Sequence, residues 1–100
     1  MNMQQMMAQA QKMQRELKKA QAELAEKEFV ITKGGAVTVT VFGSKEVKSV
    51  QIGKDAFDPE NKEMIEDMIA LAINEALAQI EAENEAINER ITGQSGGFGF

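Results

Sequence analysis

The chain has 100 residues, 43% of them hydrophobic and 27% charged, which is the size and composition of one small globular domain and excludes two independent cores. It contains no Cys, His, Trp or Tyr, so disulfides, Cys/His metal centres, thiol nucleophiles and imidazole bases are excluded. We therefore expect a protein that is not an enzyme and that has no catalytic residue, metal, cofactor or small-molecule substrate.

The chain also lacks the signals of a membrane or secreted protein. No apolar run approaches the roughly 20 residues that a membrane span needs. The Gln-rich start is unlike a signal peptide, which has a basic segment followed by an apolar one. We expect a cytoplasmic protein with no membrane partner.

Charge is distributed unevenly around the net value of -5. Residues 1–54 carry nine Lys/Arg and five Asp/Glu, whereas residues 55–100 carry two and eleven. A basic half joined to an acidic half indicates either an internal charge match or an anionic partner.

The first 27 residues predict one long helix, because they lack Gly and Pro and are rich in good helix formers. Apolar residues recur along it at alternating spacings of three and four, which is a heptad seam. The seam consists of Met3, Met6, Ala10, Met13, Leu17, Ala20 and Leu24.

Residues 28–52 change to the period of two that is typical of strands. Turn signals at residues 34–35 and 43–44 divide the segment into three strands, and turns this short require antiparallel neighbours. The alternation breaks in the third strand, which indicates a β-bulge near residues 48–49.

A second long helix is predicted after a connector at residues 53–57. Asp58, Pro59 and Glu60 provide an N-cap acceptor, a first-turn proline and an acid that complements the helix dipole. The helix is expected to continue to Thr92, where a glycine fits the C-terminal stop. Its first half is broadly apolar, as suits packing on a sheet, and its second half carries a narrower seam.

These elements predict an α+β fold, a two-layer α-β-β-β-α unit with a three-stranded antiparallel sheet and two long helices. We assign residues 1–92 to this single domain and residues 93–100 to a flexible glycine-rich tail. Both helices outrun the strands, so we expect them to pair antiparallel as a projecting arm. The seams and the open sheet edges favour a homodimer. The residues assigned to arm and dimer packing are Met6, Met13, Leu17, Leu24, Ile80 and Ile87.

The candidate binding site is a cluster of cations on the first helix, opposite the seam at 100° per residue. We call it the basic stripe, and it consists of Lys12, Arg15, Lys18 and Lys19. Exposed Lys and Arg neutralise phosphates without reading bases, which gives salt-sensitive, weakly specific DNA binding. Two alternatives stay open: a solvated face neutralised by glutamates of either helix, and a charged surface that selects a protein partner.

Three stretches of the chain together resemble the YbaB/EbfC family of bacterial nucleoid-associated proteins over essentially the full length. They are MQQMMAQAQKMQRELKKAQAELAEKE, GGAVTVTVFGSKEVKSVQI and DPENKEMIEDMIALAINEALAQIEAENEAINERITG. The resemblance implies an α-β-β-β-α fold, a tight homodimer with helical arms like tweezers, and a DNA-binding protein of the cytoplasmic nucleoid without catalysis.

The later part of the second helix departs from the family pattern. Relatives often carry Lys there, whereas this chain has Ala78 and Gln79 followed by Glu81, Glu83 and Glu85. The resemblance therefore concentrates the expected DNA contact on the first helix. We expect a homodimer that binds double-stranded DNA with low sequence specificity and organises DNA or modulates gene expression. The alternative is a dimeric coiled-arm module for protein–protein interaction without direct DNA binding.

Overall fold

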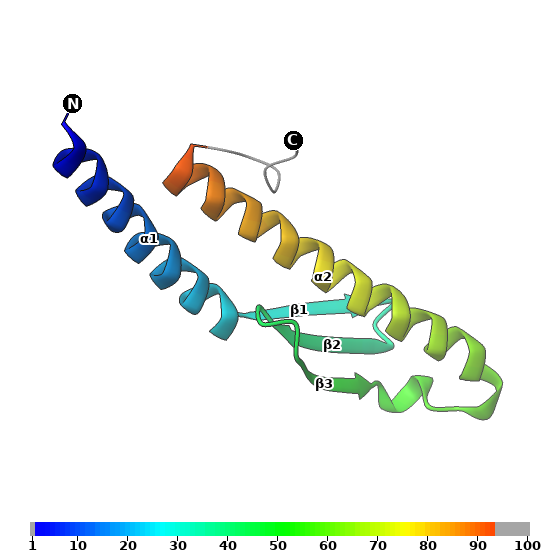
Figure 1. The fold of residues 1–100 in the computed structure, drawn as a ribbon. Coiled ribbons are helices and arrows are strands. Elements are labelled where there is room, and N and C mark those ends of the chain that lie inside the picture. The colour runs from blue at the N-terminus through cyan, green and yellow to red at the C-terminus, as the bar shows by residue number, and fades with distance from the viewer. Residues whose placement is uncertain (1, 94–100) are drawn as a thin grey trace.

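The computed structural model describes residues 2–93, so all of the predicted tail except Gly93 lies outside the described residues. Two helices flank three strands in the order that the sequence predicts, and Figure 1 shows both helices extending past the sheet. The helices and strands are α1 (Met3–Glu26), β1 (Glu28–Lys33), β2 (Val37–Phe42), β3 (Val47–Ile52) and α2 (Lys62–Thr92). Two short 3₁₀ turns, η1 (Lys54–Ala56) and η2 (Pro59–Asn61), connect β3 to α2.

Helix α1 begins at a capping box. The Asn2 side chain accepts a hydrogen bond from the Gln5 backbone N–H at 2.8 Å, and the Gln5 side chain reaches back to the Asn2 backbone N–H at 3.4 Å. This pair satisfies two of the backbone donors that a helix start leaves without a partner. The helix ends where Lys27 adopts an extended conformation and leads into β1.

The sheet has the antiparallel order β1-β2-β3. Its register places Val39 between Ile31 and Val50. The register between β2 and β3 shifts after Thr40, so that Lys48 is the extra residue of a bulge, which confirms the irregularity predicted for the third strand.

The two turns of the sheet use glycine for different reasons. Gly34 and Gly35 have φ of +57° and +64°, the left-handed region in which glycine costs least. In the second turn the left-handed residue is Lys45, with φ of 78°, and not Gly43. Gly43 is needed for close approach instead, since a Cβ there would overlap the backbone carbonyl of Leu24 at the end of α1.

The second helix starts three residues later than the sequence predicts. Asp58 acts as an N-cap, but its side chain accepts from the Glu60 N–H at 2.8 Å and caps the 3₁₀ turn η2. Within that turn the Asn61 backbone N–H donates a hydrogen bond to the Asp58 carbonyl at 2.9 Å. The Asn61 side-chain amide donates another to the Ala56 carbonyl at 3.0 Å. The tighter turn delays the α-helix to Lys62.

Helix α2 covers one face of the sheet, called the inner face. Inward side chains of β1 and β2 are buried beneath it, and the completely buried Ala72 and Ala76 let the helix approach closely. A helix is about 10 Å wide and strands are about 4.8 Å apart, so one helix covers two strands. The inner face of β3 is left only partly covered, with Val47, Val50 and Ile52 between 38% and 42% exposed.

The two helices pair antiparallel beyond the sheet, as the seams predict (Figure 1). Leu24, Ile80 and Ile87 are buried, and Leu17 packs against them half-buried. This contact is made inside one chain and needs no second copy. The molecule measures 68 × 25 × 15 Å. Neither helix in the described part of the chain is long and apolar enough to span a membrane.

Candidate nucleic-acid interface

The basic stripe lies on the exposed side of α1. All four of its residues are exposed, while the seam residues on the other side of the same helix are half-buried or buried from Met13 to Leu24. Further toward the N-terminus Met6 is exposed, because α2 ends before it. The helix therefore presents one side to α2 and its four clustered cations to solvent.

The carboxylates that could neutralise the stripe are engaged elsewhere or make no ion pair with it. In the range 2–93, no ion pair includes Lys12, Arg15, Lys18 or Lys19. Glu83 pairs with Lys27 at 2.8 Å at the base of the arm, and Glu28 pairs with Lys48 at 3.0 Å across the sheet. The remaining pairs are Lys33–Glu75 and Lys62–Glu66.

Two members of the stripe also line the groove where α1 meets α2. Lys12 borders a hollow of about 650 Å³ that includes Glu16 and the end of α2 at Ile91. Lys19 borders a neighbouring hollow of about 250 Å³, which Arg90 of α2 lines together with two glutamates of α1, Glu16 and Glu23. The stripe thus continues from the outer side of α1 to the groove edge.

Arg90 is a cation at the groove edge that the sequence pattern did not place in the candidate site. It is exposed, lies in the last turn of α2, and shares a hollow with Lys19 from the facing helix. The many glutamates of the second helix indicate an acidic surface. Arg90 is the one cation of this helix after Lys62. The available signal was its position close to the helix end, opposite Lys19 once the helices are paired antiparallel.

The cations of the sheet are placed differently. Lys48 is held by Glu28 and lies with its Nζ 5.7 Å from the centre of the Phe42 ring. Lys45 and Lys54 are exposed, one in the β2–β3 turn and the other in η1. Across residues 2–93, no three acidic side chains gather as a metal site. The arrangement can therefore contact an extended anion along α1, whereas the sheet offers only scattered charges.

Comparison with known proteins gives one consistent result. A family model described as the YbaB/EbfC DNA-binding family matches residues 1–95. A relative from Lachnoclostridium phytofermentans, named nucleoid-associated protein, is 46% identical over 99 residues, covering 98% of this chain and 83% of the relative. A protein of the same name from Enterococcus faecalis is 44% identical over 98 residues, covering 97% of this chain and 94% of the relative.

The fold is also found among solved structures. The crystal structure of an uncharacterised protein from Helicobacter pylori superposes with a TM-score of 0.77, over 93% of this chain and 99% of the other. The two sequences are 20% identical, so this likeness concerns the fold alone.

Proposed function

We propose a function from the finding that this chain belongs to the YbaB/EbfC DNA-binding family. The protein binds double-stranded DNA as a homodimer in the cytoplasmic nucleoid, and it does so with low sequence specificity. It acts there without catalysis and organises DNA or modulates gene expression. Its relatives carry the name nucleoid-associated protein. The observation that carries the proposal is the basic stripe, four exposed cations on one side of α1 with no ion pair within residues 2–93.

The proposed contact is with phosphates. A free Lys or Arg beside the duplex releases condensed counterions, and the resulting affinity depends on salt and little on sequence. The stripe lies along about two turns of helix, from Lys12 to Lys19. Nothing in this set reads base edges with defined geometry, so we assign it to positioning contacts and not to sequence readout.

The duplex is the proposed form of DNA. Proteins that bind single strands interleave cations with aromatic rings on which bases stack. Helix α1 has no aromatic residue, and the aromatic residues of the sheet, Phe29 and Phe42, are buried or half-buried. A row of cations along a straight helix instead suits the regular phosphates of a double helix.

The acidic second helix sets the side from which DNA approaches. Glu81, Glu85 and Glu89 are exposed on α2, and their charge repels phosphates. The chain's net charge of -5 therefore does not argue against DNA binding, because four of its 11 Lys and Arg residues are clustered on one side of α1. Arg90 beside Lys19 extends the proposed contact to the edge of α2.

The proposal is tested by fluorescence anisotropy with two duplexes of unrelated sequence and one single strand, each over a series of salt concentrations. We expect similar affinity for the two duplexes, weaker binding of the single strand, and a steep loss of affinity with salt. Replacement of all four stripe residues by Gln keeps helix propensity and is expected to abolish the steep salt dependence. A quadruple variant that binds DNA like the wild type would mean that the stripe is a solvated face and that the DNA contact lies elsewhere. A wild type that does not bind DNA would support the protein-interaction alternative.

A further inference from the structure

The first turns of α1 project beyond the end of α2 (Figure 1). A hollow of about 650 Å³ has Ala8 of α1 on one side and Gly93 on the other, so α2 stops at this level of the arm. The projecting turns carry three methionines whose side chains are 76%, 56% and 56% exposed. We call these residues the methionine face, and they are Met3, Met6 and Met7.

The methionine face continues the seam that α2 covers further along the arm. Met3 and Met6 are seam residues, and Met7 lies about 40° around the helix from Met3. Three neighbouring apolar side chains make a contiguous exposed patch, which marks a docking surface more often than single exposed residues do. Methionine side chains adapt to irregular partners, and their sulfur makes favourable contacts with aromatic rings. The patch therefore suits an aromatic partner.

The chain itself supplies aromatic residues next to this patch. Residues 94–100 have the sequence QSGGFGF, with two phenylalanines, three glycines and no charged side chain. They follow Gly93, which ends α2 with a left-handed φ of 73° and donates its N–H to the Glu89 carbonyl at 2.9 Å. This segment therefore starts beside Ala8, on the seam side of α1.

The segment is long enough to reach the methionine face. Met3 lies about 7.5 Å along the helix from Ala8. The five residues from Gly93 to Phe98 span up to about 17 Å when extended, and Phe100 reaches further. The glycines between the rings place few restrictions on the backbone, so both rings can turn toward one surface.

We propose that Phe98 and Phe100 dock on the methionine face of the same chain. The two rings take over the part of the seam that α2 is too short to cover, and they hold the first turns of α1 in the helical conformation. The basic stripe is centred about 140° around α1 from the methionine face, so docking leaves the stripe open to DNA.

A second copy or DNA fits the methionine face less well. Three side chains at a helix tip provide far less than the roughly 800 Å² per partner that a stable interface between separate molecules buries. A segment tethered at Gly93 has an effective concentration of about millimolar, so a small contact is enough. The uncharged thioethers also offer a phosphate no hydrogen-bond donor.

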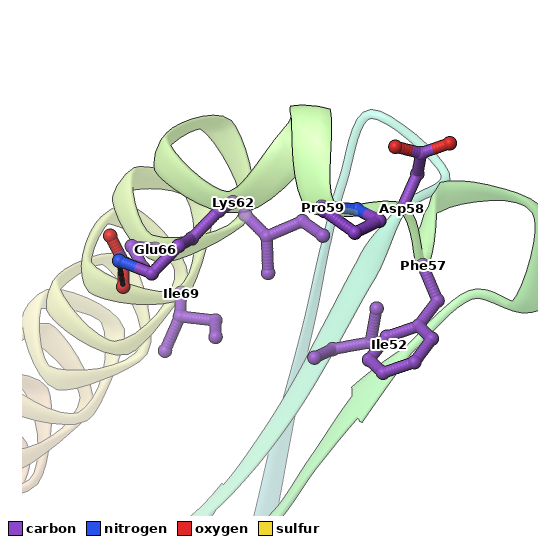
Figure 2. A pocket seen from close by; sticks show the side chains of 8 residues that line it. Ile52, Phe57, Asp58, Pro59, Lys62, Glu66 and Ile69 are labelled. Atoms are coloured by element: carbon purple, nitrogen blue, oxygen red, sulfur yellow. Dashed lines mark ion pairs between the residues drawn. The ribbon is translucent and has the colours of Figure 1, made fainter.

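The apolar pocket at the other end of α2 is out of reach of this segment. Figure 2 shows Ile52 and Phe57 on one side of the pocket, which has a volume of about 350 Å³, and Ile69 on the other. Ile69 lies about 36 Å along α2 from Gly93. Seven extended residues span at most about 25 Å, so the methionine face is the apolar opening within range.

The experiment uses fluorescence of the full chain without DNA. The chain has no Trp, so Phe98→Trp introduces a single fluorophore. This substitution is combined with Met3→Gln/Met6→Gln or, as a control, with Leu71→Gln. Leu71 is 59% exposed, close to the 56% of Met6, but lies about 33 Å along α2 from Gly93. Glutamine keeps helix propensity, and circular dichroism verifies that each variant is folded.

A peptide of residues 93–100 with the same Phe98→Trp substitution gives the values for an uncovered ring. Relative to this peptide, we expect the Phe98→Trp chain to emit at shorter wavelength. We also expect quenching by acrylamide to be at least about twofold less efficient, as docking in half or more of the molecules requires. Met3→Gln/Met6→Gln should return both values to those of the peptide, and Leu71→Gln should change neither.

Three results would overturn the proposal. They are peptide-like emission of the Phe98→Trp chain, a shift that survives Met3→Gln/Met6→Gln, and a shift that Leu71→Gln removes. Docking on a second copy is separated by refolding the Phe98→Trp/Met3→Gln/Met6→Gln chain with an excess of wild type. We expect its emission to stay peptide-like, and recovery of the shorter wavelength would place the rings on the partner and overturn docking within one chain.

Hydrogen exchange tests the effect on α1. The Met6 N–H donates to the Asn2 carbonyl at 3.1 Å in the first turn of α1. We expect Phe98→Ser/Phe100→Ser to speed amide exchange at residues 6–9 by at least about twofold, with residues 65–80 of α2 unchanged. Equal exchange in this variant and the wild type would overturn the claim that the rings hold the start of α1.

Discussion

Lys27 and Glu83 connect the bases of the two paired helices: the Lys27 ammonium lies 2.8 Å from both carboxylate oxygens of Glu83. The same Nζ lies 5.2 Å from the centre of the Phe29 ring, so one cation contacts both α2 and the first strand. This contact occupies the junction where the chain leaves α1 and enters the sheet. It also explains why Glu83 does not neutralise the basic stripe further along the arm.

We expect Glu83→Gln to lower the free energy of unfolding by no more than about 1 kcal/mol, because both partners are substantially exposed and water screens the pair. Urea denaturation at low and at high salt measures the change, which should shrink at high salt. A salt-independent loss several times larger would mean that the pair is shielded from water.

The seam makes a larger contribution to stability than the ion pair. Leu24 is buried where α1 meets α2, so Leu24→Ala removes core contacts and is expected to cost about 2–4 kcal/mol. Met6→Ala on the exposed part of the same seam should change stability by less than about 0.5 kcal/mol. Equal effects of the two substitutions in chemical denaturation would contradict the placement of the helix pair.

Gly43 and Gly35 make a matched pair for testing close approach against backbone conformation. Gly35→Ala meets open space and suffers only left-handed strain, which costs about 1–2 kcal/mol. Gly43→Ala places a methyl group against the Leu24 carbonyl, which cannot move without shifting the end of α1. We therefore expect a lower melting temperature for Gly43→Ala than for Gly35→Ala, and the reverse order would be inconsistent with this junction.

Arg90 provides a test of whether α2 takes part in DNA binding. If Arg90 adds one phosphate contact per chain to those of the stripe, Arg90→Gln reduces the log-log salt slope of a dimer by about 1.8. Exposure of the side chain means that the fold should be unaffected. An unchanged slope would confine the DNA contact to α1.

The sequence predicts the elements well because their signals are local. The heptad spacing of α1, the glycines of the first turn and the break in alternation near Lys48 each depend on neighbouring residues, and each is found in the structure. The late start of α2 also depends on neighbouring residues. At Pro59 the chain can begin either a 3₁₀ turn or an α-helix, and residue preferences do not decide between the two.

Other features depend on how the elements meet in three dimensions. The exposure of Val50 and Ile52 follows from where α2 crosses the sheet, since on the strand pattern alone they look like core residues. The neighbourhood of Arg90 and Lys19 follows from the pairing of two helices that are far apart in sequence. Phe57 lies in a connector, where no periodic pattern of the sequence predicts that its side chain is exposed.

We propose that DNA is held by the cations of α1, which make no ion pair within residues 2–93, and not by positive charge in general. The most direct test compares the salt dependence of duplex affinity for two double variants with equal loss of charge, Arg15→Gln/Lys18→Gln on the stripe and Lys45→Gln/Lys54→Gln on the sheet and connector. The stripe variant is expected to lose about 3.6 from the log-log slope of a dimer, with the other variant close to wild type. Equal losses in the two variants, or a loss only in the Lys45→Gln/Lys54→Gln variant, would contradict the claim.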